Sequence, residues 1–142
     1  MRGSDLVGRW VLESWVQDYD DGRVKHPMGN DATGFVRYAE DGDFAVMISR
    51  SGRSPFTTGG QWDASEAEKA TAYESMLAYG GRYEFVDDHV LHHVEISLFP
   101  DWIGGVQRRR LVAAGDGTIA LEARLDAGTA QARTARIVWR RK

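Results

Sequence analysis

The sequence predicts an all-β fold: an eight-stranded antiparallel up-and-down β-barrel with one amphipathic α-helix between the third and fourth strands. Short stretches rich in β-branched and aromatic residues recur along the chain, separated by turns that contain Asp or Gly. Only residues 66–79 show helical spacing of apolar residues. A length of 142 residues suits a single hydrophobic core, so we expect one domain over residues 1–142. Closure removes exposed strand edges, and a β-sandwich is the alternative architecture.

The first three predicted strands precede the helix. Residues 9–19 (RWVLESWVQDY) form the first, which ends at an Asp-Asp-Gly turn. Residues 34–39 and 44–49 form a hairpin, because the Asp-Gly pair between them tolerates the positive φ of a tight turn. Residues 52–60 contain proline and a glycine pair, which indicates a loop.

The helix is predicted from its two ends and its spacing. Ser65 is the expected N-cap, since Glu68 three residues later can complete a reciprocal capping box. Apolar residues then recur at three- and four-residue spacing as far as Tyr79, and Gly80 and Gly81 are the expected stop. We expect this helix to act as a lid or plug of the barrel.

The strand pattern resumes after the helix. The remaining predicted strands are residues 82–86, 89–98, 105–112, 118–124 and 132–141. Eight strands enclose a lumen that side chains fill or that holds one small ligand, so the fold predicts a binding cavity.

Composition limits the classes of partner. A net charge of −3 argues against a general nucleic-acid-binding protein, although residues 108–110 and 140–142 are basic clusters. No apolar run approaches the roughly 20 residues needed to cross a bilayer, and no signal-peptide pattern opens the chain. Cysteine is absent. We therefore expect a cytoplasmic protein with neither a membrane nor a nucleic-acid partner.

Several short motifs resemble one known family. They are the Gly-x-Trp element at residues 8–10, the HPMG turn at 26–29, the hairpin at 38–42, the YGGRY segment at 79–83 and HHVEISLFPDWIG at 92–104. Together these motifs resemble the bacterial and fungal lipocalin-like domain family. The resemblance implies an eight-stranded barrel whose Trp10 closes one end, often beneath an arginine of the final strands. It implies no single activity, because small barrels of this shape include carriers, decarboxylases, isomerases and cyclases.

The strand at residues 89–98 carries the first catalytic candidate. Side chains alternate across a strand, so His92 shares an apolar face with Val90, Val94, Ile96 and Leu98. If this face lines the lumen, His92 is a buried neutral imidazole suited to acid/base chemistry or to a structural hydrogen bond.

If the lumen is instead polar, the opposite face of the same strand would line it. His93 and Glu95 would then point inward and bind the ligand. The alternation alone leaves both orientations open.

The arginine run and Tyr38 are candidates for stabilising negative charge. Arg108 and Arg110 share one face of their strand and Arg109 the other. We assign Arg110 with Tyr38 a catalytic role toward a developing oxyanion, and Arg108 a ligand-binding role. The alternatives are a solvated outer face or an arginine covering Trp10 by a cation–π contact.

Four further aromatic residues are ligand-binding candidates. Trp62, Phe99 and Trp102 lie in loops or at a strand end, where a barrel mouth is expected, and Tyr83 lies on a strand. The alternative for each is ordinary packing, with Trp102 as a plug of the barrel end.

No metal or other cofactor is predicted. His89 and His93 share a face but lie about 13 Å apart at 3.3 Å per residue, and the adjacent His92 and His93 point in opposite directions. Only His93 and Glu95 are placed to share an ion. Serine-hydrolase, phosphate-binding and dinucleotide motifs are absent from the sequence.

These features lead to three functional hypotheses. The first is a cavity that binds a small, largely apolar organic molecule and promotes its cofactor-free isomerisation, cyclisation or lyase-type breakdown. The second is a non-catalytic carrier or sensor of a hydrophobic metabolite. The third is an interaction module with a filled lumen. An exposed barrel face would also allow a homodimer.

Overall fold

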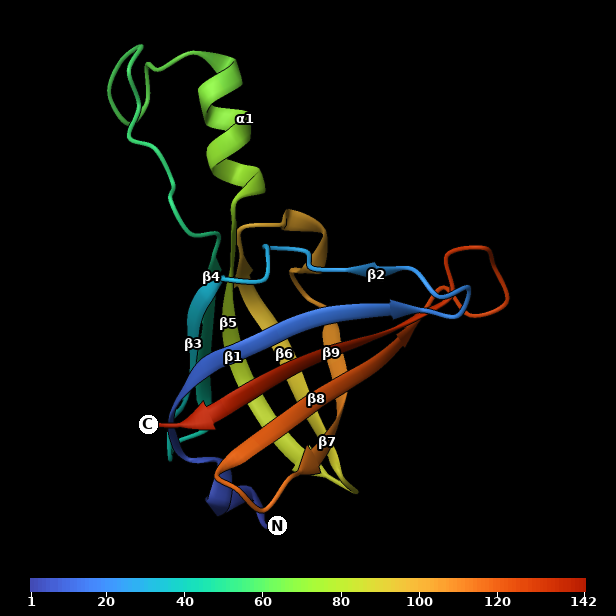
Figure 1. Cartoon of the computed structure of the whole chain (residues 1–142). Helices are drawn as coiled ribbons and strands as arrows, with labels where there is room; N and C mark the ends of the chain where they lie inside the picture. Colours follow the sequence, from blue (N-terminus) through green and yellow to red (C-terminus); the bar gives the residue numbers. More distant parts are fainter.

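The structure, a computed structural model that describes residues 1–142, is a closed β-barrel (Figure 1). Its strands are β1 (Gly8–Tyr19), β2 (Val24–Lys25), β3 (Thr33–Tyr38), β4 (Asp43–Ser49), β5 (Met76–Val86), β6 (His89–Ser97), β7 (Val106–Ala113), β8 (Thr118–Leu125) and β9 (Arg133–Arg141). All neighbouring pairs are antiparallel, and β1 also pairs with β9, so eight strands close the barrel. The short β2 only pairs, antiparallel, with the last residues of β1. The predicted eight-stranded barrel is confirmed.

The helix is shorter than the sequence predicted. Helix α1 covers Glu66–Glu74, and after Ser75 the eleven residues Met76–Val86 form β5. Ser65 is the N-cap and accepts a hydrogen bond from the Glu68 amide at 3.2 Å. The Glu68 carboxylate instead accepts hydrogen bonds from the amides of Thr57 and Thr58, so the capping box is only half formed.

The helix also does not cover the barrel. In Figure 1, α1 projects beyond the end of β5, away from the strands. None of its residues is buried, and Tyr73 is 45% exposed. The expectation of a lid or plug was therefore wrong: the apolar side chains that suggested an amphipathic face belong partly to β5.

Gly80 and Gly81 lie inside a strand, where close backbone approach requires glycine. A Cβ atom on Gly81 would lie 2.0 Å from the carbonyl oxygen of His93. A β-bulge occurs here, because Gly80 pairs with Ile96 whereas Gly81 pairs with Val94. The pair that was predicted to stop the helix therefore shapes the barrel wall.

The bulge changes which side chains of β6 face inward. Val90, His92 and Val94 are buried, as alternation predicts. The extra residue Glu95 shifts the alternation, so Ile96 is 71% exposed. The prediction that Ile96 and Leu98 share the inner face was therefore wrong.

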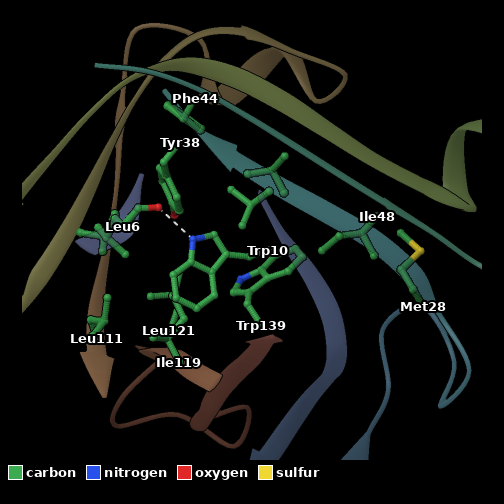
Figure 2. Packing of buried hydrophobic residues seen from close by; sticks show 13 residues of the cluster. Leu6, Trp10, Met28, Tyr38, Phe44, Ile48, Leu111, Ile119, Leu121 and Trp139 are labelled. Carbon is green, nitrogen blue, oxygen red and sulfur yellow. Dashed lines mark hydrogen bonds between the residues drawn. The ribbon is translucent and has the colours of Figure 1, made fainter. Parts of the chain in front are cut away.

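Buried hydrophobic side chains pack together inside the barrel, with Leu6 and Trp10 among them (Figure 2). The indole Nε1 of Trp10 donates a hydrogen bond to the carbonyl of Leu6 at 2.8 Å, and Leu6 belongs to the 3₁₀ turn η1 (Gly3–Leu6). The guanidinium of Arg141 lies 4.0 Å from the centroid of the Trp10 ring. The arginine that covers Trp10 thus comes from β9 and not from the run at 108–110. No helix of the structure has the length and apolar character needed to span a membrane.

Candidate functional site

His92 lies inside the barrel between two tyrosine hydroxyls. The hydroxyl of Tyr38 on β3 lies 2.7 Å from Nε2, and the hydroxyl of Tyr79 on β5 lies 3.0 Å from Nδ1. His92 is only 2% exposed. The structure thus joins His92 and Tyr38, two of the residues selected from the sequence, and adds Tyr79, which the sequence reasoning had placed in the helix.

Aromatic rings surround this hydrogen-bonded chain. The ring of Phe44 stacks on the imidazole with a centroid distance of 4.3 Å. Tyr83 packs against Tyr38 at 4.7 Å, and its hydroxyl donates to the carbonyl of Ala39. Tyr83 therefore forms part of the wall of the site through its ring, with its hydroxyl already engaged.

Tyr38, His92 and Tyr79 are all neutral near pH 7, and burial moves the pKa of each further from neutrality. It lowers the pKa of His92 to about 3, and the positive charge of Arg109 acts in the same direction. Burial raises the pKa of Tyr79 to about 12, against the opposing influence of Arg109, and raises the pKa of Tyr38 well above its ordinary value. A neutral imidazole donates through one nitrogen and accepts through the other, which matches its two tyrosine partners.

Arg109 is the positively charged residue whose side chain lines the inner cavity. Its Nη2 donates to Oε1 of Gln107 at 2.8 Å, and its Nη1 donates to the carbonyl of Arg108 at 3.0 Å. Arg108 and Arg110 have exposed side chains on the outer face, so the structure does not place Arg110 beside His92 and Tyr38. The three consecutive arginines give no signal of which one points inward, because that depends on the pairing of β7 with β6 and β8.

The enclosed cavity beside these groups is small. Its volume is about 20 Å³, enough for about one water molecule. It is lined by Val36, Tyr38, Val46, Leu77, Tyr79, His92, Arg109, Leu121, Ile137 and Trp139. Trp139 is 1% exposed, and its Nε1 is a buried donor without a hydrogen-bond partner. The lumen that the fold predicted is therefore largely filled by side chains.

Two ligand-binding candidates on β6 point away from the lumen. Nε2 of His93 lies 2.7 Å from Oε1 of Glu84 in an exposed ion pair, and Glu95 is also exposed. Up to the bulge, the face of β6 that carries Val90, His92 and Val94 therefore points inward, and the face that carries His93 points outward. No group of three or more His, Asp or Glu side chains is placed to hold a metal ion.

The loop aromatics have separate locations. The ring of Trp102, in the turn η2 (Pro100–Trp102), contacts Tyr79 edge-on at 5.2 Å and Phe99 at 5.5 Å. In Figure 1 this turn lies at the end of the barrel away from the N-terminus. Trp62 is 80% exposed in the segment before α1 and does not line the cavity.

Sequence reasoning missed Arg109, Tyr79, Phe44 and Trp139 as site residues. For Tyr79 a signal existed: Leu77 and Tyr79 alternate with Ala78 and Gly80 as inward residues of a strand do. The helical spacing upstream obscured it.

Comparison with known proteins agrees with the fold. A relative with 37% identity over 60 residues is the 4'-hydroxy-3'-methoxypropiophenone carrier protein ppsC of Aspergillus oryzae; the match covers 37% of this chain and 54% of that protein. The chain thus spans about half the length of this curated relative.

A solved structure, an uncharacterised protein from Bacteroides eggerthii, aligns with a TM-score of 0.50 at 16% identity, over 97% of this chain and 100% of that one. This similarity concerns the fold alone. The sequence model of the lipocalin-like domain matches residues 7–142. This chain therefore belongs to the lipocalin-like domain family.

Proposed function

We propose that this protein binds a small, mainly apolar organic molecule in the barrel lumen and carries it without changing it. The observation that carries the proposal is that hydrogen bonds join the side chains of Tyr38, His92 and Tyr79 inside the barrel, where aromatic rings surround them. Small-molecule sites typically combine an apolar lining with a few polar groups that fix the orientation of the ligand. The carrier named among the relatives of this chain supports the same class of function.

The electrostatics of the lumen favour carrying over catalysis. An efficient acid/base catalyst has a pKa near the working pH. Here the pKa of His92 lies at about 3 and that of Tyr79 at about 12. These groups are suited to hold an oxygen atom of a ligand by hydrogen bonds, and neither readily exchanges a proton near neutrality.

The small cavity implies that a ligand displaces side chains as it enters. At the end beside Trp10, the indole donates a hydrogen bond to the carbonyl of Leu6 in η1, whereas at the other end the ring of Trp102 contacts Tyr79. Phe99 and Ile103 on either side of this turn are exposed. We propose entry at this end, with Trp102 moving aside.

Titration with 4'-hydroxy-3'-methoxypropiophenone, monitored by tryptophan fluorescence and calorimetry, tests this proposal. We expect saturable binding, and recovery of the compound unchanged after incubation. Tyr79→Phe should weaken binding about three- to tenfold, the value of one hydrogen bond. The matched control Tyr73→Phe, in exposed α1, should bind like the wild type. Absence of binding by this phenol and by its methyl ether would contradict the proposed function.

Catalysis by a cofactor-free isomerase, cyclase or lyase is the second candidate. It is favoured by the position of Arg109 beside the Tyr–His–Tyr chain, since donors around a developing oxyanion stabilise a transition state. Conversion of the bound compound into a new product, lost in His92→Gln, would replace the carrier proposal with this one.

A further inference from the structure

The enclosed cavity is rich in hydrogen-bond donors. Arg109 has five N–H donors, of which the structure pairs two, with Gln107 and the carbonyl of Arg108. Trp139 contributes a buried Nε1–H without a partner. Both side chains line the same small cavity. Two of the side chains that line the cavity therefore have N–H donors that the structure leaves unpaired.

The Tyr–His–Tyr chain adds one more donor, whichever tautomer His92 adopts. A neutral imidazole accepts a hydrogen bond from one tyrosine and donates one to the other. The tyrosine that accepts keeps its own O–H proton free, and neither hydroxyl has a partner other than His92. Because Tyr38 and Tyr79 both line the cavity, the tyrosine with the free O–H is a lining residue in either case.

The positive charge of Arg109 has no carboxylate partner. The ion pairs of this protein involve other side chains and lie on the outer surface or at the barrel ends. The titratable groups that line the cavity with Arg109 are Tyr38 on β3, Tyr79 on β5 and His92 on β6, while β8 and β9 contribute Leu121, Ile137 and Trp139. None of these carries a negative charge near neutrality. A partly buried cation without a counter-ion is costly, and an anion beside it is correspondingly favoured.

We infer that the ligand of this barrel carries a weakly acidic oxygen, as in a phenol, an enol or a carboxylic acid, and binds as its anion against Arg109 and the free tyrosine hydroxyl. This inference rests on the proposed function. An oxyanion accepts several hydrogen bonds and donates none, which matches a cavity whose unused groups are donors. A phenol that binds in this way releases its proton to solvent.

A matched pair of ligands tests the inference. 4'-Hydroxy-3'-methoxypropiophenone has an ionisable phenol, and its methyl ether, 3',4'-dimethoxypropiophenone, does not. We expect the phenol to bind at least about tenfold more tightly at neutral pH, as hydrogen bonds to a charged group imply. Arg109→Gln should remove most of this preference, whereas Arg108→Gln, which removes the same charge from the outer face, should retain it.

The wild-type protein provides a second measurement that does not depend on the folding of a variant. The ultraviolet absorbance of an acylphenol changes on ionisation, so the bound compound reports its own protonation state. We expect the phenol to ionise at lower pH when bound than when free. Equal affinity for phenol and ether, or an unchanged or raised ionisation pH, would overturn the inference and leave the proposed function standing. Binding of neither compound would reject both.

Discussion

The hydroxyl of Tyr38 lies 2.7 Å from Nε2 of His92, although 54 residues separate the two positions in the chain. Both side chains are buried, Tyr38 on β3 and His92 on β6, strands that are not neighbours in the sheet. The contact therefore crosses the lumen and exists only because the sheet closes into a barrel. It also satisfies two polar groups that would be costly to bury alone.

Removing the Tyr38 hydroxyl should destabilise the fold. In Tyr38→Phe the ring remains, but Nε2 of His92 loses its only hydrogen-bond partner inside the barrel. Leaving one buried polar group unpaired costs about 1–3 kcal/mol, which urea unfolding would measure. Tyr73→Phe on exposed α1 is the control and should change the free energy of unfolding by less than about 0.5 kcal/mol. Equal stability of both variants would argue against the buried hydrogen bond.

His92 should make the stability of the protein depend on pH. Its pKa is about 3 in the folded state against an ordinary value of 6.5, so the unfolded chain binds more protons between these two values. The stabilisation is therefore complete above pH 6.5 and is lost as the pH falls towards 3. Between pH 7 and pH 5 the loss should be about 2 kcal/mol, at 1.36 kcal/mol per pH unit.

Two substitutions isolate the contribution of His92 to the pH dependence of stability. His92→Gln should show a much flatter dependence over the same pH interval, measured by urea unfolding at each pH. His93→Gln, the adjacent outward residue paired with Glu84, should keep the wild-type dependence. The assignment to His92 fails if His93→Gln flattens the profile instead.

Gly81→Ala should disturb the barrel wall at the bulge of β6. The added Cβ would lie 2.0 Å from the carbonyl oxygen of His93, and a backbone atom cannot yield as a side chain would. We expect a loss of about 1–3 kcal/mol in the free energy of unfolding, as for other overpacked sites. Gly105→Ala, where the nearest atom lies at 3.4 Å, should be tolerated much better. Comparable thermal melting of the two variants would contradict this reasoning.

Removing the helix should leave the barrel intact. The amide of Arg50 donates a hydrogen bond to the carbonyl of Ser75 at 3.0 Å. Residues 51–74 therefore leave the sheet at the end of β4 and return to it at the adjacent start of β5. Replacing residues 51–74 with an Asn-Gly turn would join β4 and β5 as a hairpin. We expect the circular dichroism of the barrel strands and binding of 4'-hydroxy-3'-methoxypropiophenone to be preserved. Loss of binding without loss of folding would give α1 a role in the site.

Much of the fold follows from local features of the sequence. β-branched and aromatic stretches, the Asp-Gly turn and the Ser65 cap act over a few residues, so they can be recognised without knowing the rest of the structure. The alternation of β6 likewise placed His92 on the apolar face, which the structure shows to be the inner one.

The composition of the site depended on contacts between distant strands. Arg109 faces inward because β7 pairs with β6 in one register, and a shift by one residue would have turned Arg108 and Arg110 inward instead. Tyr79 belongs to a strand because β4 and β6 pair on either side of it, although the local spacing favours a helix. The sequence by itself thus determined the barrel and the apolar strand face that carries His92, but not whether this face points inward. Only the tertiary structure decided which arginine and which second tyrosine join His92, because strand register and barrel closure are set by long-range pairing.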